Sequence, residues 1–247
     1  MGESVKPEVH SFKTLRDASL ALAERIVETA RVAIEEHGQY TMALSGGKTP
    51  ELLYSLLASE FSERMAWNSI HLFWVDERFV PQDHPDSNFR MAYHAWISKV
   101  PIPRQNIHRI PTETETPEEA ARSYEKNLKE FFDPPDNKSI PAFDAILLGV
   151  GTDGHTASLF PGSRVLGEKS RWVVSVEAPP SVFPKKRITL TLPLINNSRE
   201  VFFFAFGDEK KNVLRAIFEE PEKAKKVYPA AMVKARERLL WYVEKRT

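Results

Sequence analysis

A buried strand followed by a glycine-rich loop, in the middle of the chain, limits the possible folds more than any other stretch. Residues 143–162 read FDAILLGVGTDGHTASLFPG. The apolar run Ala145–Leu148 is typical of a strand that is buried on both faces of a parallel sheet. The loop behind it carries Asp153 and His155 just beyond the carboxyl end of the strand, where open α/β sheets bind their ligands. This stretch therefore predicts an α/β fold with a functional loop at its centre.

Three interpretations of this loop compete. Its three glycines satisfy the dinucleotide pattern G-x-G-x-x-G, but a pyrophosphate would then lie against the carboxylate of Asp153, and Pro161 cuts the following helix short. A purely structural turn is the second interpretation, with glycines that supply positive φ and with His155 as a helix cap. The third is a general acid/base histidine that an oriented carboxylate accompanies, on a loop whose bare backbone admits a small substrate.

The rest of the chain alternates predicted strands and helices. Thr14 and Asp17 resemble a capping box and open a helix that ends at Gly38, and further helices are expected after Ser87, Thr116 and Gly207. About eight strands in mostly strand–helix order predict a doubly wound, Rossmann-like, mostly parallel sheet with helices on both faces. At this length the whole chain, residues 1–247, is expected to form one α/β domain. The predicted strands span residues 40–44, 70–75, 107–110, 145–148, 172–176, 188–192, 201–206 and 239–243.

A second glycine turn follows the predicted strand 40–44. Ser45, Gly46 and Gly47 lead into a helix, with Thr49 expected at the N-cap and Pro50 at the first helical position. The free N–H groups and the positive end of the helix dipole converge at such a turn, so the segment predicts an anion site.

The same turn fits two other interpretations. A P-loop would need glycine at position 42, which holds Met42, so a monophosphate fits better than a nucleoside triphosphate. A plain glycine turn between strand and helix is the structural alternative.

Three charged residues, Asp76, Glu77 and Arg78, leave the predicted strand 70–75 at the same edge of the sheet. A guanidinium can bind phosphate through two parallel hydrogen bonds, so Arg78 is the candidate for an anion contact. Asp76 could bind sugar hydroxyls or hold a neighbouring arginine. A solvated charged face is the structural alternative.

Three of these segments together resemble one known family. GVGTDGHTASLFPG, SGGKTP (residues 45–50) and VDERFVP (residues 75–81) occur in the order found in 6-phosphogluconolactonases, lactone hydrolases of the oxidative pentose phosphate pathway in the glucosamine-6-phosphate isomerase/6-phosphogluconolactonase family. The resemblance runs to the closing segment RLLWYV. It implies that Lys185 and Arg187, in a basic cluster that would otherwise be taken as a solvated loop, meet the substrate. Lys48 departs from the family pattern, where relatives often carry a small hydroxyl residue.

The resemblance implies hydrolysis of the δ-lactone ring of a phosphorylated sugar acid. Ser45, Gly46 and Gly47, together with Arg78, would hold the 6-phosphate and so fix the distant carbonyl near His155. The histidine would take a proton from the attacking water while N–H groups or a basic side chain stabilise the oxyanion. No metal or organic cofactor is expected. The chain has no G-x-S-x-G elbow for a serine nucleophile, which favours direct attack by water.

Two alternative functions remain at this point. Glucosamine-6-phosphate deaminases share the D-G-H turn but carry a glutamate where this chain has Phe160, and a tyrosine where it has Arg78. A sugar-phosphate-binding protein without catalytic activity is the other alternative, although it would not need His155 beside Asp153.

Composition excludes several classes of partner. The formal net charge of +0 gives no reason to expect a nucleic acid or an anionic membrane as partner. The absence of cysteine removes disulfides and thiolate chemistry. The polar start MGESVKPEVH lacks the apolar segment of a signal peptide, so we expect a cytoplasmic enzyme. A monomer or a weak homo-oligomer is expected.

Overall fold

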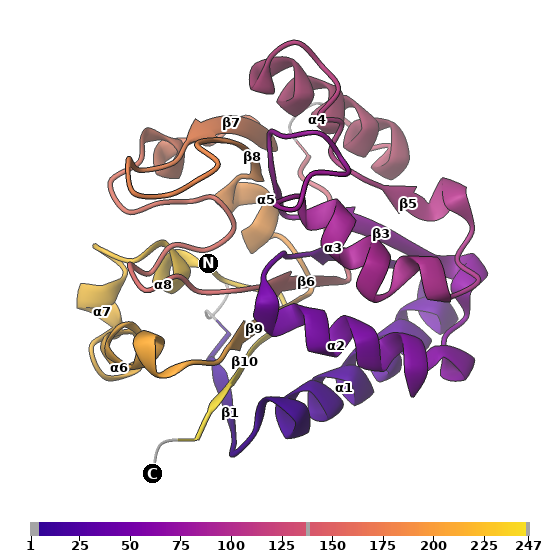
Figure 1. Ribbon diagram of the computed structural model, residues 1–247, viewed down its shortest axis with the longest axis horizontal. Helices are drawn as coiled ribbons and strands as arrows, with labels where there is room; N and C mark the ends of the chain where they lie inside the picture. Colours follow the sequence, from indigo (N-terminus) through magenta and orange to yellow (C-terminus); the bar gives the residue numbers. More distant parts are fainter. Residues whose placement is uncertain (1–4, 137–138, 246–247) are drawn as a thin grey trace.

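A parallel seven-stranded sheet forms the centre of the molecule (Figure 1). The computed structural model describes residues 5–136 and 139–245. Every neighbouring pair of strands in this sheet is parallel, and β6, the strand predicted as central, lies in the middle. The spatial order is β1 (Glu8–Phe12), β10 (Arg238–Glu244), β9 (Glu200–Ala205), β6 (Ala145–Leu148), β2 (Tyr40–Leu44), β3 (Ile70–Trp74) and β5 (Ile107–His108).

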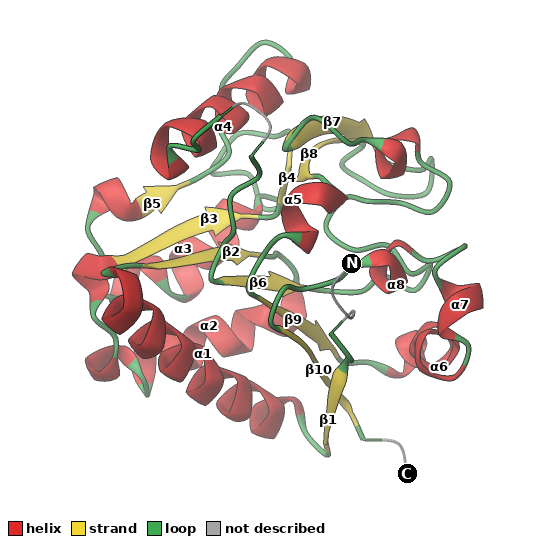
Figure 2. Cartoon of the chain, turned by 180° about the vertical axis from the view of Figure 1, so that it is seen from behind, coloured by secondary structure: helices red, strands yellow, loops and turns green. Residues whose placement is uncertain are grey.

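Helices cover both faces of this sheet. Figure 2 shows α1 (Leu15–His37) and α2 (Lys48–Ser59) on one face, with α5 (Leu192–Asn196) and α6 (Lys211–Glu219) on the other. The buried side chains of α1 recur every three or four residues, so one face of the helix packs on the sheet. Within the described residues, every helix is too short or too polar to cross a bilayer. The remaining α-helices are α3 (Asn88–Ala95), α4 (Pro117–Phe132), α7 (Pro221–Ala224) and α8 (Pro229–Met232).

A second, antiparallel sheet of three strands was not predicted. It consists of β4 (Asp76–Arg78), β8 (Lys186–Leu190) and β7 (Val173–Glu177), and α4 packs against it. The chain passes between the sheets at Val75, whose N–H donates to the last carbonyl of β2 and whose carbonyl accepts from the N–H of Leu190. The three charged residues that leave the predicted strand 70–75 therefore form a strand of their own.

Local predictions were mostly confirmed, with corrections to some bounds and caps. The strand expected at 188–192 spans Lys186–Leu190, and Leu192 begins α5. The predicted helix from Thr14 to Gly38 is confirmed: the Thr14 hydroxyl accepts from the N–H of Asp17, and Gly38 ends the helix with φ 84°. The N-cap of α2 is Gly47, not Thr49. The helix expected after Ser87, to Lys99, ends at residue 95, and a short 3-10 helix follows at residues 97–99. The edge strand β1, whose residues alternate between half-buried and exposed, was missed.

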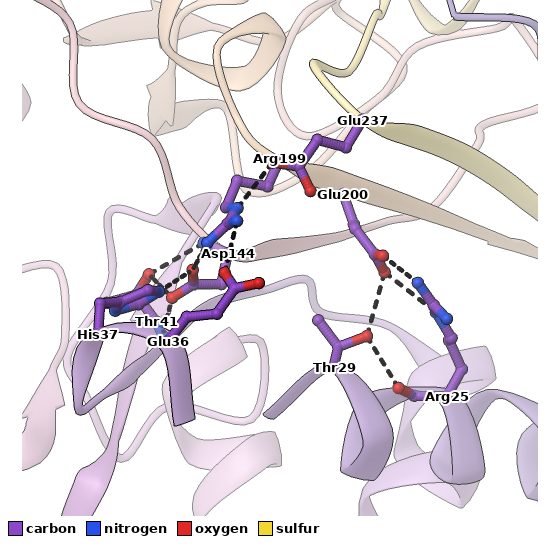
Figure 3. Close-up of polar contacts among 9 residues, drawn as sticks. All are labelled: Arg25, Thr29, Glu36, His37, Thr41, Asp144, Arg199, Glu200 and Glu237. Atoms are coloured by element: carbon purple, nitrogen blue, oxygen red, sulfur yellow. Dashed lines mark hydrogen bonds and ion pairs between the residues drawn. The ribbon is translucent and has the colours of Figure 1, made fainter. Parts of the chain in front are cut away.

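Buried carboxylates fix α1 to the amino ends of the strands (Figure 3). Asp144, directly before β6, accepts from both the N–H and the hydroxyl of Thr41 at 2.8 Å, and lies 2.9 Å from Nε2 of His37. Glu200, the first residue of β9, is paired with Arg25 of α1. Removing such groups would leave buried donors unsatisfied, so this network stabilises the fold at the edge opposite the glycine loops. We call these contacts of Asp144 and Glu200 with α1 and β2 the clamp.

Two histidines pack at the outer edge of the parallel sheet. Nδ1 of His71 lies 3.1 Å from Nε2 of His108, whose ring stacks on Phe73 at 4.3 Å. Burial, reinforced by the neighbouring His71, lowers the pKa of His108 to about 4. Burial also lowers the pKa of His71. Both rings are therefore neutral when the protein is folded at pH 7.

We expect Asp144→Asn to lower the free energy of unfolding by about 2 kcal/mol, the size of a lost hydrogen bond to a buried charge. The amide keeps the shape of the side chain but places a donor against Thr41 or His37. Urea unfolding at pH 7 measures the change, and catalytic constants should stay at wild-type values because the clamp lies at the opposite edge. A variant as stable as wild type would contradict the clamp.

A second prediction concerns acid stability. Because the unfolded chain binds protons on histidine near pH 6.5 and folded His108 only near pH 4, stability falls as the pH drops from 6.5 towards 4. His108→Phe, which keeps the ring stack but does not titrate, should lose less stability over this range. Urea unfolding at several pH values measures both slopes. Tyr93→Phe, at an exposed residue of α3 of a type that does not titrate in this range, is the control and should retain the wild-type slope.

Candidate active site

A pocket of about 230 Å³ opens at the carboxyl edge of the parallel sheet. It is formed where the glycine turn before α2, strand β4 and the loop after β6 meet, as the carboxyl ends of neighbouring parallel strands do. Seven of the nine predicted site residues line it, and Asp153 and Lys185 do not. The seven are Ser45, Gly46, Gly47, Asp76, Arg78, His155 and Arg187.

The N-terminus of α2 forms one wall of the pocket. Gly47 adopts φ 106°, a conformation that a side chain would strain, and no side chain caps the helix. Within the described residues, the first N–H groups of α2 therefore receive no side-chain cap and are available to an anion. The hydroxyl of Tyr54, in α2, donates to the carbonyl of Ser45 at 2.8 Å. This bond holds the glycine turn against the helix.

Strand β4 presents Asp76 and Arg78 to the pocket and turns Glu77 away, as the alternation of a strand requires. One carboxylate oxygen of Asp76 accepts from the hydroxyl of Ser158 at 2.6 Å. Nη1 of Arg78 donates to the carbonyl of Asp86 at 2.6 Å, which holds the guanidinium at the pocket. The register of β4 with β8 places Arg78 opposite Arg187.

Only one member of the basic cluster in residues 185–187 enters the pocket. Arg187 is buried, and its guanidinium donates to the carbonyls of Pro184 and Phe183. Burial lowers its pKa, and the nearby charge of Asp76 opposes this effect. Lys185 lies outside the pocket, with its ammonium 5.3 Å from the centre of the Phe183 ring, so its predicted substrate contact stays a prediction. Lys186 is exposed.

His155 and Asp153 form a close pair at the pocket. Nδ1 of His155 lies 2.5 Å from Oδ1 of Asp153, which also accepts the backbone N–H of His155 at 3.1 Å. Burial raises the pKa of Asp153, but the hydrogen bond and charge of His155 bring it below its ordinary value, so the carboxylate stays ionised. Because Asp153 occupies Nδ1, Nε2 is the nitrogen that can accept a proton. A Cβ at Gly151 would lie 2.1 Å from Nδ1, so the ring needs a glycine there.

The turn after His155 is braced against the second sheet. The N–H of Ser158 donates to the hydroxyl of Thr189 in β8, in addition to the bond from its own hydroxyl to Asp76. The hydroxyl of Thr156 donates to the carbonyl of Gly149 at 2.8 Å. Ala157 is held at φ 49°, an uncommon conformation for a residue with a side chain. These contacts fix the histidine loop relative to β4.

Ten lining residues were not among the predicted site residues, and three of these carry a charged or amide side chain: Lys48, Asn88 and Lys210. Burial lowers the pKa of Lys210, which lies in the turn after β9. Its position past the carboxyl end of a predicted strand could have indicated a site residue, but the surrounding polar run GDEKKN is typical of solvated surface. In the described part of the chain, no three histidine, cysteine, aspartate or glutamate side chains are arranged to hold a metal ion.

Comparison with known proteins agrees with this geometry. Residues 13–241 match the family described as glucosamine-6-phosphate isomerases/6-phosphogluconolactonase. The chain is 45% identical over 214 residues to the 6-phosphogluconolactonase of Synechocystis sp., which covers 86% of this chain and 85% of that protein. It is 36% identical over 250 residues to 6-phosphogluconolactonase 3, chloroplastic, of Arabidopsis thaliana, covering 99% of this chain and 75% of that protein.

A solved structure shares the fold over the same extent. The crystal structure of 6-phosphogluconolactonase from Thermotoga maritima matches with a TM-score of 0.83 and 32% sequence identity, and covers 97% of this chain and all (100%) of that one. The fold class and the family expected from the three motifs are thereby confirmed. The chain belongs to the family of glucosamine-6-phosphate isomerases and 6-phosphogluconolactonases.

Proposed function

We propose that this protein hydrolyses 6-phospho-D-glucono-1,5-lactone to 6-phosphogluconate, with His155 as the general base that activates water. The observation that carries the proposal is that one pocket joins a carboxylate-held histidine to an uncapped helix N-terminus and two arginines. The names and identities of the relatives support the same reaction.

The phosphate end of the substrate would lie against the turn before α2. The free N–H groups of this helix, the positive end of its dipole and the guanidinium of Arg78 favour a dianion. Arg187 and Lys210 add positive charge within the same pocket. Binding energy at this end fixes the lactone carbonyl near the histidine, which reduces the entropy cost of reaching the transition state.

In the proposed reaction, the nitrogen of His155 that Asp153 leaves free acts as the base. Nε2 takes a proton from water as its oxygen forms a bond to C1 of the lactone, and the carbonyl electrons move to the oxygen. The ring C–O bond then breaks, and the imidazolium returns its proton to the departing ring oxygen, giving the open acid. Asp153 holds the tautomer and stabilises the transient imidazolium. Backbone N–H groups or a basic side chain of the pocket stabilise the oxyanion.

The surroundings of His155 favour a lactonase over a deaminase. Where the deaminases carry a glutamate, this chain places Phe160, which is 2% exposed and packs 4.9 Å from the imidazole centre. Asp153, which contacts the ring, belongs to the D-G-H turn that both kinds of enzyme share, so the difference lies at Phe160. A protein that only bound sugar phosphates would have no use for the pair of His155 and Asp153.

Four further properties are proposals that rest on the sequence. These are a cytoplasmic location, a monomer or weak homo-oligomer, a single domain of residues 1–247, and a substrate contact by Lys185. Two of the relatives bear on location: the Arabidopsis protein is named chloroplastic and the Synechocystis protein is not.

His155→Ala should fold normally and reduce turnover by roughly two to four orders of magnitude, since the variant lacks the base. The lactone is generated in situ, and acid release is followed with and without the protein. His10→Ala, at a half-exposed histidine of strand β1 outside the pocket, should retain wild-type turnover. Near-wild-type turnover of folded His155→Ala would refute the role of the histidine. A wild-type rate equal to the spontaneous one would refute the lactonase itself.

Arg78→Ala tests the phosphate contact. The change removes a charge-assisted contact made to substrate and transition state alike, so the loss should appear mainly in KM and amount to about 1.5–3 kcal/mol. Unphosphorylated δ-gluconolactone should be a poor substrate for wild type and should lose little further activity in the variant. Exposed Arg104→Ala is the matched control. An equal proportional loss on both lactones would move Arg78 from the phosphate to the reacting carbonyl.

A further inference from the structure

Asn88 lies between the glycine turn and strand β4. It is the first residue of α3, is 2% exposed and lines the pocket. Its Nδ2 donates to the carbonyl oxygen of Asp76 at 3.0 Å and lies 3.3 Å from Oδ1 of the same residue. Rotating the amide by 180° would place its oxygen against these two acceptors, so the orientation of the side chain is fixed.

The fixed amide points its oxygen at Gly46. A Cβ on Gly46 would lie 1.7 Å from Oδ1 of Asn88 and 2.2 Å from Cγ. Gly46 does not adopt a positive φ, so its backbone would accept alanine; the obstacle is Asn88. Oδ1 is buried and has no hydrogen-bond partner among the described residues. The amide therefore contacts the turn by packing, without a hydrogen bond.

Glu77 fixes Asn88 from the other side. This buried carboxylate accepts the backbone N–H groups of Arg78, Asn88 and Phe89 at 2.7 to 2.8 Å, and the hydroxyl of Ser87 at 3.1 Å. The start of α3 is thus tied to the strand that carries Asp76 and Arg78. Asn88 cannot move away from Gly46 without breaking contacts to β4.

We infer that Asn88 is a positioning residue that sets the place of the Gly46 turn relative to Asp76 and Arg78. The inference rests on the proposed function, in which this turn holds the phosphate of the substrate. Asn88 acts through Gly46 and Asp76, because its own oxygen is closed off from the pocket. A displaced turn would misplace the phosphate, and with it the distant lactone carbonyl.

The test is a double-mutant cycle of Gly46→Ala and Asn88→Ala. Gly46→Ala should lower kcat/KM roughly a hundredfold, as expected for a displacement of the turn by about 1 Å. Asn88→Ala should raise KM and lower kcat, with a combined loss of about tenfold in kcat/KM, since it removes the support of the turn. The double variant should recover to the level of Asn88→Ala, because the added methyl group then has room.

Recovery is the decisive result, since a merely destabilising change at Asn88 would not improve Gly46→Ala. A double variant whose loss equals the product of the two single losses would overturn the inference. Asp144→Asn, which perturbs a buried carboxylate at the opposite edge, is the control for destabilisation and should keep the wild-type KM. Melting temperatures of all variants show whether they are folded.

A binding measurement separates this inference from the proposed function. Calorimetric titration with 6-phosphogluconate should reproduce the loss and the recovery as changes in Kd. If the wild type binds this ligand and the cycle shows recovery but no lactone is hydrolysed, the proposed function fails and the positioning role stands. If hydrolysis is normal and the cycle is additive, the positioning role fails alone.

Discussion

The buried carboxylate of Asp76 holds together segments that are far apart in the sequence. It accepts from Ser158 in the histidine loop and from Asn88 at the start of α3, and it belongs to the strand that also carries Arg78. Because Asn88 also packs on Gly46, the glycine turn before α2, strand β4 and the histidine loop have fixed relative positions before any substrate binds. Catalysis by positioning depends on this kind of rigidity, since small displacements of bound groups cost large factors in rate.

The two edges of the parallel sheet use similar side chains for different purposes. At the amino edge, Asp144 contacts His37, and at the carboxyl edge Asp153 contacts His155. The Asp144 carboxylate is 5% exposed and is also bonded to the strand by Thr41, so it stabilises the fold. Asp153 is 42% exposed and its histidine lines a pocket. An aspartate–histidine contact is therefore not by itself a sign of catalysis; its place on the sheet and its access to solvent decide the role.

Most predictions that rest on local pattern were confirmed, with the N-cap of α2 and the end of α3 as exceptions, whereas the short strands that depend on distant pairing were missed. The cap at Thr14, the end of α1 at Gly38 and the central strand Ala145–Leu148 follow from residues close in the chain. Strand β4 is three residues long and exists because β8, more than a hundred residues later, pairs with it. Edge strand β1 likewise depends on its pairing with β10. No local signal distinguishes such short strands from charged loops.

The sequence by itself determined the fold class, the family and the segments that form the pocket, because glycine turns after buried strands have local causes. Only the tertiary structure decided which side chains enter the pocket: Arg187 and Lys210 do, and Lys185 does not. It also showed that Gly46 is constrained by Asn88, a contact across 42 positions in the chain. The physical reason is that side-chain direction depends on strand register and on packing between elements, and both are fixed only when distant segments meet.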